Sequence, residues 1–97
     1  MRTDEFEWDD VKAAANLVKH NVSFETARRA FSDPFMVERE DDRDDYGEPR
    51  LTLLGMVNNR LLFVAYTMRG DTVRIISARG AEPHEQRLYH EENRDRF

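Results

Sequence analysis

Three segments in the second half of this chain follow one another so closely that they constrain the fold more than any other feature. Residues 50–57 have a strand-like pattern, residues 61–68 are apolar on both faces, and residues 72–78 are rich in β-branched side chains. Three residues separate the segments at each junction, and they include Asn58-Asn59 and Gly70-Asp71, two dipeptides that favour tight turns. Strands joined by such short turns pair antiparallel, so the sequence predicts a meander.

The first third of the chain has helical spacing instead. Four apolar residues recur at i, i+3, i+4 and i+7, between an N-cap at Asp9 or Asp10 and a left-handed C-terminal residue at Asn21. They are Val11, Ala14, Ala15 and Val18. We expect them to face the core, beside a polar stripe that spans about 100° of the helix circumference. That stripe consists of Lys12, Asn16, Lys19 and His20, of which Asn16 is expected to fix a loop or cap a strand.

A second helix follows directly. Ser23 is its expected N-cap, and Phe24, Ala27 and Phe31 have the spacing of an inward face. Asp33-Pro34 ends the helix, because the residue before a proline disfavours the helical conformation. Two helices joined so closely predict a helical hairpin.

Two short strands and a last helix complete the predicted elements. Residues 4–8 alternate, which predicts a half-buried strand, and residues 35–40 predict another before an acidic loop that reaches about Pro49. Pro83 suits the first turn of a helix that extends to about residue 95. Because its only clear apolar anchors are Leu88 and Tyr89, we expect this helix to be mobile or docked on a partner.

These elements predict a single α+β domain over residues 1–97. It has two layers, a mostly antiparallel sheet with the N-terminal helical hairpin on one face, and a C-terminal helix. The chain has no cysteine, which excludes disulfides and thiolate zinc sites. His84-Glu85 begins an H-E-x-x-H motif, but Leu88 stands where the second histidine is needed. We therefore expect no metal and no cofactor.

The charge balance argues at first against a nucleic-acid ligand. The chain has 15 basic and 20 acidic residues, a net charge of −5. The distribution weakens this objection, because residues 11–34 and 51–80 carry more basic than acidic side chains. No apolar run approaches the ~18 residues of a membrane span, so we expect a cytoplasmic protein without membrane contacts.

Three motifs occur in order between residues 6 and 89. The first comprises Phe6-Glu7-Trp8-Asp9, Lys12, Asn16, Lys19-His20, Val22, Phe24 and Ala27. The second comprises Gly47-Glu48, Arg50 and Gly55, and the third Arg74-Ile75-Ile76-Ser77-Ala78-Arg79, Ala81, Glu85 and Tyr89. In this order and spacing they resemble the BrnT toxins, the ribonuclease components of type II toxin–antitoxin pairs.

The resemblance implies a RelE-like fold and cleavage of RNA without a metal ion. It also implies neutralisation by a BrnA-type ribbon-helix-helix antitoxin in a 2:2 complex, with the DNA operator contacted only through the antitoxin. Two positions depart from the family pattern: Pro49 stands where a glutamate is frequent, and Gly80 where a lysine is usual. The second departure removes one positive charge near the expected site.

Cleavage of this kind needs few catalytic groups, since the ribose 2′-oxygen of the RNA attacks the adjacent phosphorus. The protein has to hold the phosphate, offset its charge and move two protons. Arg79 is the strongest candidate, because its guanidinium can bind a phosphate in bidentate fashion. The alternative is that Arg79 only anchors the last helix or meets an antitoxin carboxylate. His20 is a candidate acid or base, or else a helix-terminal histidine that the helix dipole favours.

The remaining candidates each have an equally ordinary alternative. Arg74 joins Arg79 as a catalytic candidate only if a bulge or the end of the strand redirects Arg79, because strict alternation places the two on opposite faces. Lys12 and Lys19 are phosphate contacts or a solvated helix face, and the resemblance adds Arg50 as a third phosphate contact. Glu85 could accept a proton, but an ion pair with Arg79 is the favoured interpretation.

Two other functions stay open at this stage. The chain could be a non-catalytic module that binds its antitoxin and acts only in operon autoregulation. It could also be an unrelated small α+β interaction protein. The overall acidity and the missing family charges weigh toward the non-catalytic module as a rival to the ribonuclease. The unrelated interaction protein is the weaker alternative.

Overall fold

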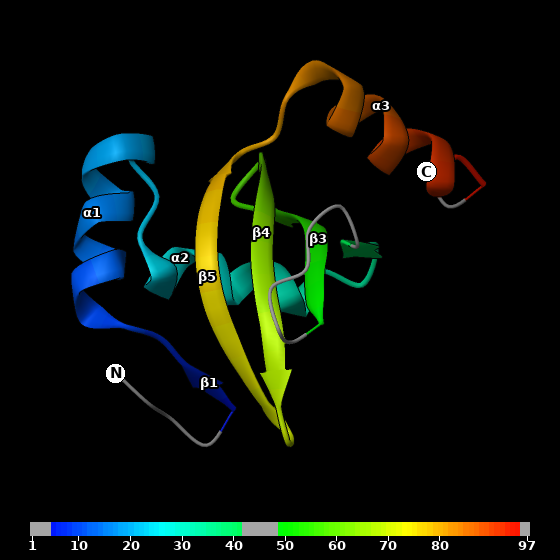
Figure 1. Cartoon of the computed structure of the whole chain (residues 1–97). Helices are drawn as coiled ribbons and strands as arrows, with labels where there is room; N and C mark the ends of the chain where they lie inside the picture. The colour runs from blue at the N-terminus through cyan, green and yellow to red at the C-terminus, as the bar shows by residue number, and fades with distance from the viewer. Residues whose placement is uncertain (1–4, 42–48, 96–97) are drawn as a thin grey trace.

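The computed structural model describes residues 5–41 and 49–95 and has an α+β fold (Figure 1). Its elements are β1 (Phe6–Glu7), α1 (Asp10–His20), α2 (Phe24–Arg29), the 3-10 helix η1 (Ala30–Ser32), β2 (Val37–Asp41), β3 (Arg50–Val57), β4 (Arg60–Arg69), β5 (Thr72–Gly80) and α3 (Pro83–Glu92). The predicted acidic loop falls largely on residues 42–48, outside the described residues. No helix of the described part is both long and apolar enough to cross a bilayer.

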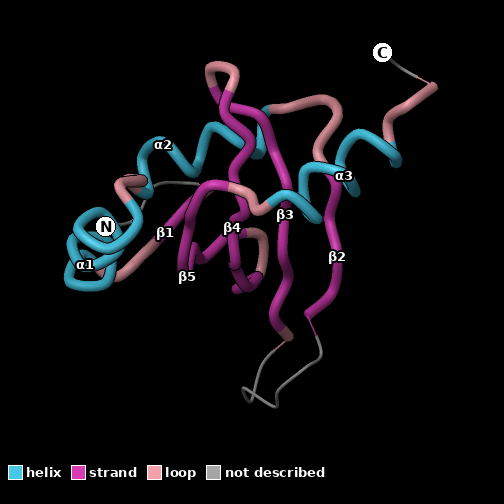
Figure 2. The backbone as a smooth tube through the Cα atoms, turned by 90° about the horizontal axis from the view of Figure 1, so that it is seen from above, coloured by secondary structure: helices cyan, strands magenta, loops and turns pink. Residues whose placement is uncertain are grey.

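The five strands form one sheet in the order β1-β5-β4-β3-β2 (Figure 2). The short β1 pairs parallel with β5, and the other neighbours pair antiparallel. The predicted meander is therefore confirmed, with β4 as the central strand of the sheet, where apolar side chains are needed on both faces.

The predicted turns and caps form as expected. Left-handed φ angles occur at Asn21, Asn58, Asn59 and Gly70. Asn58-Asn59 joins β3 to β4, and asparagine tolerates this conformation better than most residues. The side chain of Asp9 accepts hydrogen bonds at the start of α1, and that of Ser23 does so at the start of α2.

Two apolar clusters lie on opposite faces of the sheet. Leu53 and Leu54 are neighbours in β3, so their side chains point to opposite faces, and each belongs to a different cluster. The first cluster contains Phe24 and Ala27, and α1, α2 and η1 contact β5 or β3. The second cluster contains Tyr89 of α3. The sheet therefore separates two apolar clusters, and α3 packs on the face opposite the one that α2 covers.

The predicted orientation of α1 is wrong. Val11 and Val18 are 79% and 89% exposed, whereas Asn16 is only 7% exposed. The Asn16 amide donates hydrogen bonds of 2.9 and 2.8 Å to the carbonyls of Val22 and Ala78, and its oxygen accepts one of 3.1 Å from the Ala78 N–H. These three bonds turn the side of α1 that carries Asn16 toward β5. The apolar face consequently points to solvent, while the expected role of Asn16 in fixing the loop and the strand is confirmed.

Polar contacts hold α3 in addition to its two predicted anchors. Tyr89 is buried and its hydroxyl donates a hydrogen bond of 2.6 Å to Asp33. Asn93, directly after the helix, donates one of 2.9 Å to the carbonyl of Phe35. Leu88 packs against the second cluster. The helix ends at Glu92, earlier than the predicted residue 95.

Gly55 allows η1 to approach β3 closely. A Cβ at this position would lie 2.4 Å from the carbonyl oxygen of Ala30 and 2.8 Å from its Cβ. We expect Gly55→Ala to lower the free energy of unfolding by about 2 kcal/mol, because backbone has to move to admit the methyl group. Urea unfolding measures this loss. Gly80→Ala is the matched control, because its added methyl meets only the flexible end of Arg60; an equal loss in both variants would contradict the explanation.

Candidate active site

One end of the sheet carries a cavity of about 730 Å³ between four elements. The C-terminal end of α1, the β3–β4 turn, the last residues of β5 and the start of α3 meet there, at the top of the view in Figure 1. The polar side chains that line it are Lys19, His20, Asn59, Arg60, Arg79, Gln86 and His90. No acidic side chain lines it among the described residues, so the cavity favours an anionic ligand.

Three of the predicted site residues share this cavity. Lys19 and His20 come from the last turn of α1, and Arg79 comes from β5. The folding of α1 against β5 therefore brings together cations that lie about sixty positions apart in the chain. This juxtaposition forms a hollow with cations on its wall, which suits an anionic group such as a phosphate.

Arg79 is held on several sides. Its two terminal nitrogens donate hydrogen bonds of 2.8 and 2.9 Å to the two oxygens of Glu85, and a carboxylate oxygen of Glu82 lies at 3.4 Å. The guanidinium also lies 4.3 Å from the centre of the Phe63 ring. The predicted ion pair with Glu85 is thus confirmed, in a bidentate geometry that fixes the plane of the guanidinium.

Glu85 is buried and ionised. Burial by itself would raise its pKa, but hydrogen bonds from Arg79 and from the Glu82 N–H outweigh burial and lower the pKa below its usual 4.5. The carboxylate therefore stabilises the folded state above that pH. Its side chain also completes the capping box that begins α3, so one residue positions both Arg79 and the helix.

The lowered pKa of Glu85 predicts a specific acid sensitivity. We expect the folded state to lose stability as the pH falls below about 4.5, because protonation of Glu85 removes its bonds to Arg79. Glu85→Gln should lower the free energy of unfolding by about 2 kcal/mol at pH 7. Between pH 5 and pH 3, the free energy of unfolding of this variant should change less than that of the unaltered chain. Denaturant unfolding at several pH values measures both. Parallel pH dependences in the two proteins would contradict the assignment.

A β-bulge overturns the expectation that Arg74 and Arg79 lie on opposite faces. Ile76 has no partner residue in β4, so it is an extra residue that shifts the alternation of β5 by one. Arg74 and Arg79 oppose Thr67 and Phe63, which are four residues apart in β4 and share one face. The two arginines therefore lie on the same face of the sheet.

Arg74 nevertheless lies away from the cavity. The residues that Arg74 and Arg79 oppose lie four positions apart in β4, so about 13 Å separates the two arginines along the sheet. Its guanidinium forms an ion pair of 3.1 Å with Glu7 of β1. It does not line the cavity, so the structure brings together only one of the two arginines with His20.

Lys12 and Arg50 do not line the cavity either. Lys12 is exposed in the first turn of α1, and Arg50 is the first residue of β3, where it stands opposite Asp41 of β2. Both side chains lie outside the cavity, and their predicted contacts with an RNA phosphate stay predictions.

Arg60 and His90 are the main cavity residues that the sequence analysis missed. A Cβ on Gly80 would lie 3.0 Å from a terminal nitrogen of Arg60, so the guanidinium occupies the space that a side chain at position 80 would fill. Arg60 thereby places a cation beside position 80. The register of the predicted meander could have identified Arg60, because it places the start of β4 beside the end of β5. No signal in the sequence shows which way His90 faces.

One cluster in the described part of the chain has ligand types that a metal ion prefers. Side-chain atoms of Glu82, His84 and Glu85 lie within 4.8 Å of one another. Both carboxylates, however, already face the guanidinium of Arg79. A second cation at this place would be repelled by that fixed charge.

Comparison with known proteins gives one family. The model of a family described as "Ribonuclease toxin, BrnT, of type II toxin-antitoxin system" matches residues 8–85, which is most of the chain. A search of curated proteins finds no significant match. The matched range covers Lys19, His20, Arg79 and Glu85, and it ends before His90.

Proposed function

Because this chain belongs to the BrnT family of ribonuclease toxins of type II toxin–antitoxin systems, we propose that it is an endoribonuclease that acts without a metal ion. The observation that carries the proposal is the cavity with cations and imidazoles on its wall and no carboxylate among its described lining residues. Oxygen ligands are what Mg²⁺ needs, and the cavity has the opposite chemistry, a set of groups suited to phosphate.

In this mechanism the RNA supplies its own nucleophile. The 2′-oxygen attacks the neighbouring phosphorus, a base removes the 2′ proton, and an acid protonates the 5′-oxygen as its bond to phosphorus breaks. The products are a 2′,3′-cyclic phosphate and a 5′-hydroxyl. We assign proton transfer to His20 and His90, and contact with the phosphate oxygens to Lys19 and Arg60.

Arg79 has a different part in the mechanism. Glu85 holds its guanidinium at the wall of the cavity, so its orientation is set before the substrate arrives. Its charge offsets the charge that builds on the phosphate in the transition state. Glu85 then acts as a positioning residue through Arg79, and it does not take a proton from the RNA.

Membership of the family also indicates the protein partner of this chain. A type II toxin has a protein antitoxin, which we propose to be a BrnA-type ribbon-helix-helix protein in a 2:2 complex that alone contacts the operator. We also propose a RelE-like arrangement of the domain and action in the cytoplasm. The cation-rich cavity favours catalysis over the alternative of a module that only binds its antitoxin, because binding a protein does not require two imidazoles on the wall of a cation-lined cavity.

Cleavage assays on purified protein test this function. We expect the chain to cleave single-stranded RNA in the presence of EDTA and to leave 2′,3′-cyclic phosphate ends, which mapping of the fragment ends detects. His20→Ala should lower the rate about 100-fold, since a positioned acid or base contributes at least this much. His84→Ala is the matched control, because His84 is exposed on α3 and does not line this cavity.

Two results would count against the proposal. If the purified chain binds its antitoxin but leaves RNA intact, it is the non-catalytic module. If EDTA abolishes cleavage and Mg²⁺ restores it, the reaction uses a metal ion and the assignment of His20 and His90 falls.

A further inference from the structure

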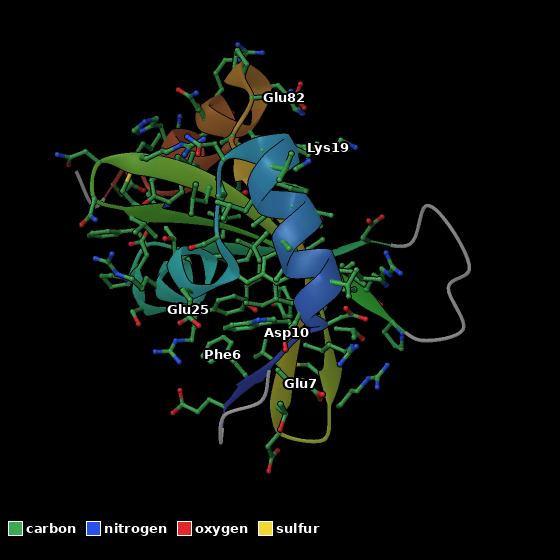
Figure 3. The ribbon with its side chains drawn as sticks, turned by 90° about the vertical axis from the view of Figure 1, so that its left-hand side faces the viewer. Phe6, Glu7, Asp10, Lys19, Glu25 and Glu82 are labelled. Atoms are coloured by element: carbon green, nitrogen blue, oxygen red, sulfur yellow. The ribbon has the colours of Figure 1, made fainter. Side chains whose placement is uncertain are left out.

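The outward face of α1 is apolar and uncovered. Val11 and Val18 are 79% and 89% exposed, and Ala14 and Ala15, one turn from each, are also exposed. In Figure 3, α1 runs across the front of the molecule from Asp10 to Lys19, and no described element lies over it. These four residues, named here the α1 stripe, share an arc of about 100° that is opposite the buried Asn16.

The α1 stripe has the geometry of a helix-docking surface. Val11 and Val18 are seven residues apart, the repeat at which one helix meets another along a seam. The two alanines between them are small enough for a second backbone to approach closely. A single exposed valine is ordinary, but four aligned apolar residues that avoid the core of their own domain indicate a partner.

The charges beside the α1 stripe indicate the chemistry of that partner. Lys12 and Lys19 flank the stripe on one side, also seven residues apart, and both are exposed. A helix with an apolar face and acidic residues along one edge complements this pattern. A second copy of this chain packed antiparallel on the same stripe would set lysine against lysine.

We propose that the α1 stripe is the docking surface for the antitoxin, which covers it with an amphipathic helix that carries acidic residues along one edge. This inference rests on the proposed function for its occupant, since a type II toxin has a protein antitoxin as its partner. The same helix carries Lys19 and His20 into the cavity. A partner that covers α1 therefore lies beside the cavity, where it can obstruct the RNA.

Affinity measurements test the docking surface. The probe is the purified product of the reading frame adjacent to the gene for this chain, titrated by calorimetry. We expect Val18→Asp to weaken binding at least 10-fold, and Val11→Asp combined with Val18→Asp to weaken it further. Lys12→Glu should weaken binding several-fold and reduce its salt dependence. Met68→Asp is the matched control, because Met68 is 42% exposed on β4 and should leave affinity within twofold.

The outcomes separate the surface from the function. Thermal unfolding has to show that each variant is folded, which the exposure of these side chains favours, and RNA cleavage by the isolated Val18→Asp variant should equal that of the unaltered chain. Equal affinity in all variants, or no binding by the unaltered chain, would overturn the proposal. Self-association that Val18→Asp abolishes, with antitoxin affinity unchanged, would overturn it in favour of a second copy. Loss of affinity in a chain that never cleaves RNA would uphold the surface and remove only the proposed catalysis.

Discussion

Replacement of Arg79 by alanine is expected to lower RNA cleavage about 1,000-fold, the largest effect on activity of any single change to the cavity. Arg79 is the cation whose orientation is most completely set, by two hydrogen bonds to Glu85 and by the face of Phe63. A charge fixed in this way stabilises a transition state without the cost of reorganisation. Arg79→Lys should lower the rate of RNA cleavage at least 10-fold, because an ammonium group cannot reproduce the bidentate contact with Glu85.

This experiment needs a control for folding, because Arg79→Ala leaves the carboxylate of Glu85 buried without its partner. Such a change costs about 3–5 kcal/mol of stability, so cleavage has to be compared at equal concentrations of folded protein. Arg87→Ala removes the same charge from an exposed position on α3 and should leave cleavage unchanged. Full activity in folded Arg79→Ala would show that Arg79 only anchors α3, the alternative that its contacts with Glu82 and Glu85 also permit.

Asp33→Ala is expected to lower the free energy of unfolding by about 4 kcal/mol. One oxygen of the buried Asp33 carboxylate accepts a hydrogen bond of 2.8 Å from the Phe35 N–H, and the other accepts bonds of 2.7 and 2.6 Å from the Met56 N–H and the Tyr89 hydroxyl. One side chain thus joins the segment after η1 to β3 and to α3. Alanine removes the acceptor of these three hydrogen bonds, two of which come from other elements. Denaturant unfolding measures the loss.

Two variants decide whether these bonds are the cause. Asp71→Ala removes a carboxylate from the exposed β4–β5 turn and should change stability by less than 0.5 kcal/mol. Tyr89→Phe should lower the free energy of unfolding by about 1 kcal/mol. The loss should be smaller in the Asp33→Ala background, because the hydrogen bond between Tyr89 and Asp33 is already absent there. Additive losses in the double variant would argue against coupling between Asp33 and Tyr89.

Most of the secondary structure followed from local signals in the sequence. Turn residues with left-handed φ angles, such as Asn58 and Gly70, and caps such as Ser23 act within a few residues, so they can be identified without the rest of the chain. The apolar face of α1 was identified correctly as a set of residues but assigned to the wrong environment. Periodicity states which residues share a face, whereas the bonds of Asn16 to β5 decided which face turns inward.

The candidate site was predictable only in part. Lys19, His20 and Arg79 were expected to contribute, and they line one cavity. Arg60 was missed because its neighbour Gly80 is close in space through the β4–β5 pairing and distant along the chain. The face of Arg74 could not be derived, since it depends on the bulge of a single residue in the middle of β5.

By itself the sequence determined the order of the helices and strands, the turns between them and the chemistry available to the protein. These properties depend on side chains that act on their own backbone or on neighbours within one helical turn or one hairpin. Only the tertiary structure decided which cations meet at one end of the sheet, which face of α1 stays exposed, and how Glu85 orients Arg79. Those outcomes depend on contacts between residues far apart in the chain, where one buried amide or one extra strand residue reverses what periodicity alone predicts.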